Sequence, residues 1–210
     1  MRRWRDMESK LFAIFVFYPL LLFCLSFHES AHAWMAHKRG DDTAKLLGRI
    51  SLNPIVHMDV IGTLFLPVMA LLTGASLIGW GKPVPVDPRN FNNPRKDSLW
   101  VAAAGPISNL LLAVIFAAAL RLTLTWFPVS LLKIFHMGVF LNLVLAFFNL
   151  IPAFPLDGGT VLRGLLPAHL VPAYDRFAQY SIILLLVLFI TGLLRYVLIP
   201  VSLVADILLP

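Results

Sequence analysis

The stretch Phe27-His28-Glu29-Ser30-Ala31-His32 directly follows the run 11–26, which carries no charge. Residues four apart share one face of a helix, so His28 and His32 can offer imidazole nitrogens to one tetrahedral metal ion, usually zinc. Glu29 would lie beside that metal, placed to take a proton from a water molecule there. Because such groups are costly inside a membrane helix, the motif predicts a functional site; the alternative is polar packing between helices.

The composition is that of an integral membrane protein. Of 210 residues, 59% are hydrophobic and 13% are charged, whereas soluble domains have about half and about a quarter. The net charge of +6 is spread over short basic clusters, which fits loops facing an anionic leaflet and does not suggest nucleic-acid binding. The one cysteine, Cys24, excludes a disulfide framework and is interpreted as a packing residue rather than a ligand. We expect one domain, 1–210.

The apolar runs predict an all-α polytopic membrane protein with about four full transmembrane helices, at 11–37, 98–127, 130–150 and 177–197. The first run is too long for a signal peptide and lacks a cleavage site, so we expect a retained helix. Residues 60–79 contain Gly62, Pro67 and Gly74, which favour a re-entrant or partly buried segment. Alternating Val and Pro predict a short extended or β element near 80–88. Residues 160–176 are expected to form a loop, and Pro200 to break the tail from the last span.

Two histidines leave a zinc site one protein ligand short of the usual three. Asp157 stands out, because Pro152 and Pro155 should end the preceding helix near Leu150. Irregular backbone at membrane depth is tolerated where it lines a cavity, and a metal cavity would fit. On local chemistry alone, Asp157 can equally be an ordinary turn residue. The other candidates for the third ligand are His37, His57, Asp59, His136, His169 and Asp175.

Three elements occur in a fixed order: His28-Glu29-x-x-His32, Gly105-Pro106-x-x-Asn109 and Asn149-x-x-Pro152-x-x-Pro155-Leu156-Asp157-Gly158. With them the chain resembles the site-2 protease family of intramembrane zinc metalloproteases. It is most similar to the compact bacterial branch that lacks PDZ and CBS domains. Two further stretches of that branch are present, Asn53-Pro54-x-x-His57-Met58-Asp59 and Gly79-Trp80-Gly81-Lys82-Pro83-Val84-Pro85-Val86.

The resemblance implies that His28, His32 and Asp157 bind one zinc ion. Glu29 would be the catalytic base, and Asn149 would bind or polarise the substrate carbonyl. The implied substrate is a transmembrane helix of another membrane protein, cut within or next to the lipid bilayer in regulated intramembrane proteolysis. An extended element near the membrane face would help to hold the unwound substrate; its candidate residues are Trp80, Lys82, Pro83, Val84 and Pro85.

Three polar residues have two interpretations each. His57 and Asp59 can orient the zinc ligands, or can cap the segment that begins at Val60, and we favour the structural role. Asn109 is a candidate partner of the site, but an asparagine there is also typical of packing between membrane helices.

The metal requires the ends of the first and third spans to lie on the same side of the membrane. Residues 98–127 and 130–150 then cross it, and 60–79 does not. Ten of the seventeen Lys and Arg residues fall on that side, which is typical of the cytoplasm. We therefore expect the zinc site toward the cytoplasmic side of the cell (inner) membrane. The four basic residues within 1–10 would lie outside, against this bias.

Two other classes use the same ligands. One is a membrane metal-binding or transport protein, which has no need for Glu29 beside the first histidine. The other is a catalytically inactive scaffold, which would be free to lose a ligand or Glu29, whereas all four expected residues are present. The sequence predicts neither the identity of the substrate nor the oligomeric state.

Overall fold

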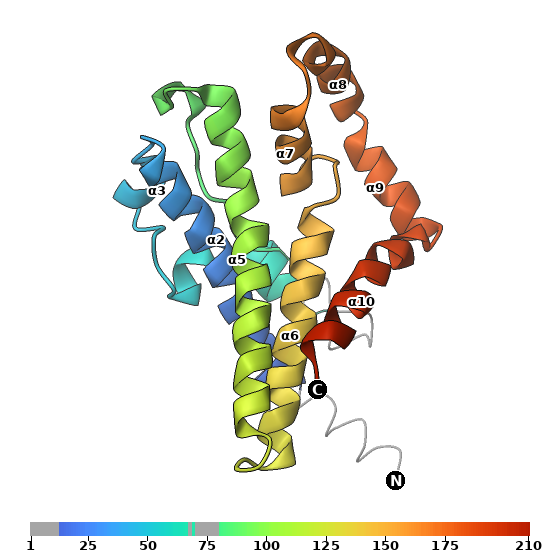
Figure 1. Ribbon diagram of the computed structural model, residues 1–210. Helices are drawn as coiled ribbons and strands as arrows, with labels where there is room; N and C mark the ends of the chain where they lie inside the picture. The colour runs from blue at the N-terminus through green and yellow to red at the C-terminus, as the bar shows by residue number, and fades with distance from the viewer. Residues whose placement is uncertain (1–12, 67–68, 70–79) are drawn as a thin grey trace.

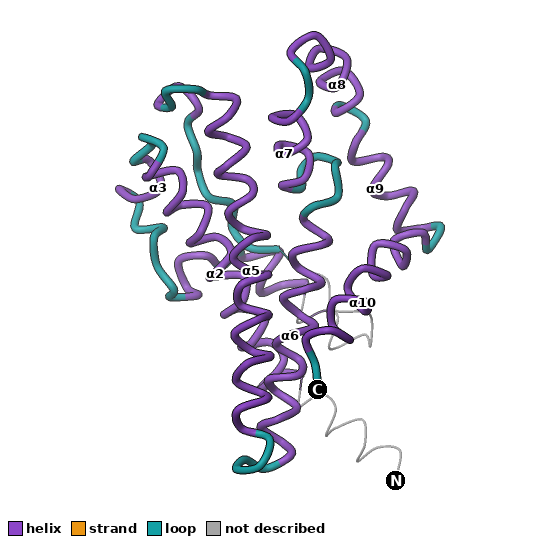
Figure 2. The backbone as a smooth tube through the Cα atoms, viewed as in Figure 1, coloured by secondary structure: helices purple, strands orange, loops and turns teal. Residues whose placement is uncertain are grey.

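The computed structural model describes residues 13–66, 69 and 80–210 (Figure 1). These residues form helices and loops, with no strand among them (Figure 2). Three helices are long and apolar enough to cross a membrane: Ile14–Lys38, Pro94–Thr123 and Leu131–Asn149. A bent pair, Ala168–Ala178 with Ser181–Ile190, supplies a fourth candidate span with a 59° angle between its halves. The predicted all-α, multi-pass architecture is thus confirmed.

Helix α2 (Tyr18–Lys38) carries the His-Glu-x-x-His motif and follows a π-helical turn, η1 (Ala13–Phe17). Pro19 lies where η1 passes into α2, and Ile14–Lys38 form one candidate span. The helix ends at Lys38, and Gly40 follows with a φ of 107°, which is open to glycine but strained for other residues. Local chemistry therefore ends the helix that carries the motif.

Helices α5 (Pro94–Thr123) and α6 (Val129–Asn149) form the centre of the molecule. The start of α5 is capped from both sides, since the Asn93 side chain accepts from Lys96 N and the Asp97 carboxylate accepts from Asn93 N at 2.8 Å. Helix α5 continues through Pro106. Two buried clusters hold the spans together. One joins α2, α5 and α6 through Cys24, Leu112 and Leu141, and the other joins α5, α6 and α10 through Ala113, Ala117, Val139, Leu143, Val201 and Ala205.

The C-terminal part differs from the expected loop and single straight span. It forms α7 (Asp157–Leu165), η5 (Ala168–Leu170), α8 (Val171–Ala178), α9 (Ser181–Ile190), η6 (Leu193–Leu198) and α10 (Ile199–Leu208). The expected span 177–197 is interrupted at Gly192, which has a φ of 70°. Pro200 lies in the first turn of α10, where proline starts a helix instead of breaking one.

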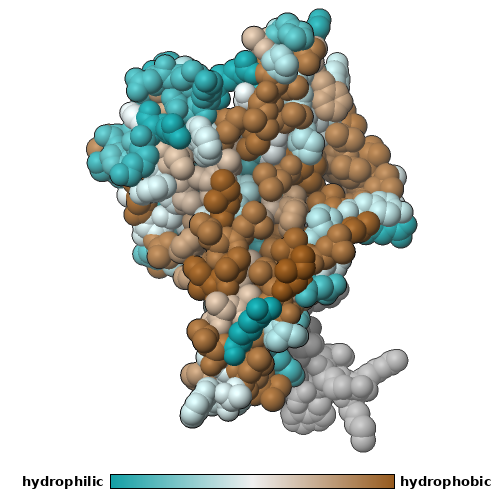
Figure 3. Space-filling view, in the orientation of Figure 1, coloured by the Kyte–Doolittle hydropathy of each residue, from teal (hydrophilic) through white to brown (hydrophobic). Residues whose placement is uncertain are grey.

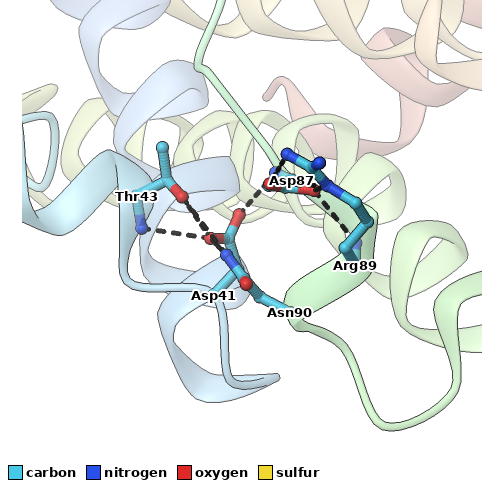
Figure 4. A network of polar contacts seen from close by, with 5 residues as sticks. All are labelled: Asp41, Thr43, Asp87, Arg89 and Asn90. Carbon is cyan, nitrogen blue, oxygen red and sulfur yellow. Dashed lines mark hydrogen bonds and ion pairs between the residues drawn. The ribbon is translucent and has the colours of Figure 1, made fainter.

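Three short elements, α3 (Thr43–Leu46), η2 (Pro54–His57) and η4 (Pro88–Asn90), follow α2 or precede α5. A fourth, η3 (Val60–Phe65, a π-helix), contacts the start of α2, where the Tyr18 hydroxyl donates to Thr63 O. Residues 80–87 form neither helix nor strand, and Lys82 N donates to His57 O at 2.8 Å. A network of hydrogen bonds around Asp41 links the α2–α3 corner to η4 (Figure 4). The predicted re-entrant segment 60–79 lies largely outside the described residues, and only its start, η3, is seen.

The end of α2 and the start of α5 lie toward the end of the molecule that also carries α7 and α8, and α6 runs toward that end (Figure 1). Hydrophilic residues gather at that end, over α3 and α8, while hydrophobic residues cover the middle (Figure 3). This arrangement agrees with the requirement that two crossings, α5 and α6, separate the two halves of the metal motif.

Candidate metal centre

Three potential ligands from opposite parts of the chain meet beside α5. His28 and His32 project from α2, and Asp157 is the first residue of α7. The carboxylate Oδ2 of Asp157 lies 3.2 Å from His28 Nε2 and 3.4 Å from His32 Nε2, and the two Nε2 atoms are 3.0 Å apart. The ligand atoms all lie within 4.8 Å of one another. One face of a two-histidine, one-carboxylate metal site is therefore assembled.

The state of Asp157 Oδ2 shows that a metal fits this cluster. The atom is buried and completes no hydrogen bond within the described residues, although it faces two imidazole nitrogens. A buried carboxylate without a hydrogen bond is costly unless a cation compensates it. The donor set, two imidazoles and one carboxylate, is one that catalytic zinc sites use.

Each histidine is oriented through its other ring nitrogen. His28 Nδ1 lies 2.5 Å from Asn109 Oδ1, and His32 Nδ1 lies 2.7 Å from the backbone oxygen of Val101. Both partners are acceptors, so each Nδ1 carries the hydrogen and each Nε2 lone pair points toward Asp157. Both partners belong to α5, so this helix orients both ligands of α2.

Gly105 explains how α5 comes so close to the cluster. A Cβ atom on this residue would lie 2.4 Å from His32 Nε2 and 2.6 Å from His28 Cε1. Such distances are far below van der Waals contact, so any side chain here would displace the imidazoles. The Gly105-Pro106 element therefore serves close approach of a helix backbone to the ligands.

The turn between α6 and α7 places Asp157. As predicted, α6 ends at Asn149, with Leu150 as its C-cap. The turn folds back tightly, because a Cβ on Gly158 would lie 2.3 Å from the carbonyl oxygens of Leu150 and Ile151. The run of prolines and glycines around Asp157 thus ends one helix and starts another at the correct place for the carboxylate.

A cavity of about 620 Å³ opens beside the cluster. Its lining includes Glu29 and Asn149, together with Trp80, Pro83 and Val84 of the expected substrate-holding stretch. Lys82 and Pro85 are not part of the lining. Glu29 faces the 80–87 segment, since its Oε1 would lie 3.5 Å from a Cβ on Gly81. Asn149 Nδ2 donates to Leu145 O at 2.9 Å, so the amide is held at the end of α6.

The other polar candidates lie in structural positions. Asp59 caps η3 by accepting from Ile61 N at 3.0 Å and Gly62 N at 2.7 Å. The Nε2 atom of His57 lies 2.7 Å from Ser51 O, and burial lowers the pKa of this imidazole. His57 and Asp59 thus contact backbone groups of their own segment, whereas Asn109 contacts His28, and the roles of all three toward the metal stay predictions.

Sequence reasoning did not identify Arg49 as part of the architecture. This arginine is buried and donates to the carbonyl oxygens of Val56, Lys82 and Pro83, the last at 3.1 Å. It ties the start of the 80–87 segment to η2. The sequence carried no local signal for this role, because two of the acceptors, the Lys82 and Pro83 carbonyl oxygens, lie 33 and 34 residues further along the chain.

Comparison with known proteins supports this chemistry. The model of Peptidase family M50 matches residues 16–126 and 124–192. "Putative zinc metalloprotease YwhC" of Bacillus subtilis is 41% identical over 202 residues, which cover 89% of each chain. "Putative zinc metalloprotease Rip2" of Mycolicibacterium smegmatis is 31% identical over 83% of this chain and 66% of that protein. "Zinc metalloprotease MJ0392" of Methanocaldococcus jannaschii is 26% identical over 72% of this chain and 34% of that protein.

No solved structure matches the chain. The family model nevertheless covers most of its length, and the relatives named above share zinc as their metal and proteolysis as their activity. The apolar helices place the protein in a membrane. The chain therefore belongs to peptidase family M50, the site-2 protease family, and is a multi-pass membrane zinc metalloprotease.

Proposed function

We propose that this protein is an endopeptidase that cuts a transmembrane helix of another membrane protein, within or next to the bilayer. The observation that carries the proposal is the junction of the two distant motifs. His28, His32 and Asp157 offer ligand atoms within 4.8 Å of one another, and Glu29 lines the cavity beside them. A metal-transport protein or an inactive scaffold would not need a carboxylate at the position of Glu29.

The proposed roles follow from the side-chain chemistry. His28, His32 and Asp157 hold the zinc ion, which when bound supplies Lewis-acid activation of water and of a peptide carbonyl. Glu29 accepts a proton from the attacking water and returns it to the leaving amine. Asn149 has a second amide hydrogen beyond the one given to Leu145 O, and this hydrogen can stabilise the developing oxyanion.

The substrate class follows from the surroundings of the cavity. Carbonyl groups in a helix are hydrogen-bonded and shielded, so a transmembrane substrate has to unwind before it can be cut. Residues 80–87 carry no helical or strand pairing of their own, and Trp80, Pro83 and Val84 reach the cavity. An unwound substrate can pair with this segment by strand addition. Cleavage of such a membrane-protein substrate is the step that regulated intramembrane proteolysis requires.

The orientation follows from the charges at the site end. Basic residues belong to the end of α2, to α3 and η4, to the start of α5 and to α7, namely Lys38, Arg39, Lys45, Arg89, Arg95, Lys96 and Arg163, whereas Arg121 and Lys133 belong to the end of α5 and the start of α6. Positive charge marks the cytoplasmic side of membrane proteins. The zinc site therefore lies toward the cytoplasmic face of the cell membrane.

The test separates metal binding from catalysis in detergent-purified protein. Asp157→Asn should lower zinc below one equivalent per chain, as measured by mass spectrometry. Glu29→Gln should keep full zinc but lower cleavage about 10²–10⁴-fold, the usual contribution of a general base. Asp206→Asn, an exposed carboxyl on α10, is the matched control and should keep both. Full zinc in Asp157→Asn, or undiminished cleavage in Glu29→Gln, would overturn the assignment.

The substrate class has its own test. Single-span model helices of leucine and alanine are placed in liposomes with the protease, with and without a central Gly-Pro pair that weakens helical pairing. We expect cleavage near the Gly-Pro pair and at least tenfold slower cleavage without it. Equal cleavage of both helices, or cleavage of a soluble unfolded protein alone, would contradict an unwinding transmembrane substrate.

A further inference from the structure

Beneath the metal cluster, a chain of buried amides connects all three long spans. Asn109 Oδ1 lies 2.5 Å from His28 Nδ1, and Asn109 Nδ2 donates to Asn142 Oδ1 at 2.8 Å. Asn142 Nδ2 in turn lies 2.8 Å from Gly138 O and 3.1 Å from Cys24 Sγ. Asn109, Asn142 and Cys24 are all 0% exposed. Polar groups this deep in membrane helices are expensive unless every one is paired.

We propose that Asn142 is a positioning residue for the metal site, because it fixes through Asn109 which nitrogen of His28 carries the hydrogen. The inference rests on the proposed function of His28 as a zinc ligand. Asn142 touches neither the cluster nor the cavity, and its effect has to pass through Asn109.

The direction of the hydrogen bonds along these buried amides is set at the Gly138 carbonyl. The Gly138 carbonyl can only accept a hydrogen bond, so Asn142 has to turn its NH₂ group toward it. The Asn142 oxygen then faces Asn109, which has to present its own NH₂ group there. The Asn109 oxygen is thereby left facing His28 Nδ1. The Asn109 amide could otherwise exchange its oxygen and its NH₂ group by rotation, and this contact with Asn142 holds it in one of the two orientations.

The consequence reaches the metal through the imidazole ring. With an acceptor at Nδ1, His28 keeps its hydrogen there and leaves the Nε2 lone pair free, 3.2 Å from Asp157 Oδ2. If Asn109 turned over, its NH₂ group would face Nδ1 and favour the opposite tautomer, with hydrogen on Nε2 and no lone pair for the metal. Asn142 thus protects the binding-competent tautomer.

His32 needs no second side chain to fix its tautomer. His32 Nδ1 bonds to Val101 O at 2.7 Å, and a backbone carbonyl of α5 cannot turn over. The two ligands therefore differ in what secures them, the main chain for His32 and two side chains for His28. Substitution of Asn142 should weaken the site through His28 alone.

The experiment measures metal affinity instead of proteolysis. Zinc affinity is determined by competition with a chromophoric chelator, and the absorption of the Co²⁺-loaded protein reports the coordination. Asn142→Ala, and Asn142→Leu which fills the same volume, should lower zinc affinity about 10–100-fold, the usual effect of losing a ligand's hydrogen-bond partner. Ser26→Ala removes a buried hydroxyl bonded only to Leu22 O of its own helix and should leave affinity unchanged.

Two further variants distinguish polarity from general packing. Cys24→Ala keeps the Gly138 carbonyl, so affinity should stay within about twofold. Adding Asn109→Asp to Asn142→Leu should restore affinity and the Co²⁺ spectrum, because a carboxylate accepts from His28 in either sense and needs no partner to hold it. Purely structural damage would not be repaired in this way.

Every outcome bears on the inference. Unchanged affinity in Asn142→Leu, or a loss that Asn109→Asp fails to repair, would overturn the role of Asn142. If Asn142→Ala and Asn142→Leu do not fold, Asn142→Ser decides, since its short hydroxyl can donate to the Gly138 carbonyl but leaves Asn109 without the acceptor that orients it, so zinc affinity should fall as well, and unchanged affinity would overturn the role. A wild-type protein that binds no zinc, or an Asp157→Asn protein that keeps it, would instead overturn the proposed ligands.

Discussion

The three spans α2, α5 and α6 and the C-terminal helices α8–α10 are similarly apolar, but they differ in what they bury. Between the three spans, polar groups such as His28, Asn109 and Asn142 are buried and partnered. Along α9, by contrast, large apolar side chains are exposed, namely Ile182, Ile183, Leu186, Phe189 and Ile190. Hydrophobicity alone therefore says that both regions belong in a membrane, but not which of them is a packed site.

The difference has a physical cause. Lipid chains are as apolar as leucine, so apolar surface in a bilayer gains little by packing against one particular neighbour. A buried amide or imidazole has to find a partner with the correct donor or acceptor, and that requirement selects one arrangement. The site region is specified by its polar residues, and the C-terminal helices are held mainly where Val201 and Ala205 of α10 enter the α5–α6 cluster.

The strongest way to break the site region without touching a polar group is Gly105→Ala. The added Cβ would lie 2.4 Å from His32 Nε2, so the imidazoles or α5 have to move. We expect at least a tenfold loss of zinc affinity and cleavage near background. Gly192→Ala is the control, because nothing lies within 4 Å of its added Cβ, and it should keep zinc while straining a turn with a φ of 70°. Normal zinc affinity in Gly105→Ala would contradict the close approach of α5.

A pair of leucines sharpens the comparison between the two regions. Leu143 is 0% exposed between α5, α6 and α10, whereas Leu186 of α9 is 54% exposed. Leu143→Ala should destabilise the protein by roughly 2–3 kcal/mol, the lower part of the range for buried leucines, because a lipid-solvated unfolded state removes part of the transfer cost. Leu186→Ala should cost less than about 0.5 kcal/mol. Thermal unfolding in detergent measures both, and equal losses would refute the distinction.

The corner between α2 and α3 offers a polar contrast outside the spans. The carboxylate of Asp41 accepts from Thr43, from Asn90 Nδ2 at 2.8 Å and from Asp87 N at 2.7 Å (Figure 4). Asp41→Ala leaves these donors unpaired and should cost about 1–3 kcal/mol. Asp42→Ala, which removes a more exposed carboxylate beside His37 and Lys45, should cost clearly less. Unfolding temperatures in detergent decide between the two.

The smallest expected effect is the response of this corner to acid. Hydrogen bonds from Arg89 lower the pKa of Asp87 to about 2, and although burial alone would raise the pKa of Asp41, its hydrogen bonds lower it. Both carboxyls are more acidic in the folded protein, so they stabilise it above the ordinary value of 3.8, and this contribution falls as the pH falls toward about 2. Zinc-free protein should show a falling unfolding temperature over this window, and the Asp87→Asn variant a shallower fall. An identical profile in the variant would remove Asp87 from the effect.

Much of this architecture could be predicted from the sequence because its signals are local. The three long spans appear near their expected positions, and Pro152 with Pro155 correctly predicted the end of α6 near Leu150. The segment 160–176 was expected to be a loop but is mostly helical, since a helix at a membrane surface needs no continuous apolar run. The break at Gly192 was missed because glycine is common inside membrane helices.

What the sequence determined by itself is the membrane character, the position of His28 and His32 on one face of a helix, and the bends that present Asp157. These depend on composition, on the 3.6-residue period and on prolines, all of which act over a few residues. Only the tertiary structure decided that Asp157 meets the histidines, that Asp59 caps a helix, and that Asn109 and Asn142 form one buried chain with His28. Such pairings join residues far apart in the chain, and donors and acceptors can be matched only after the helices have packed.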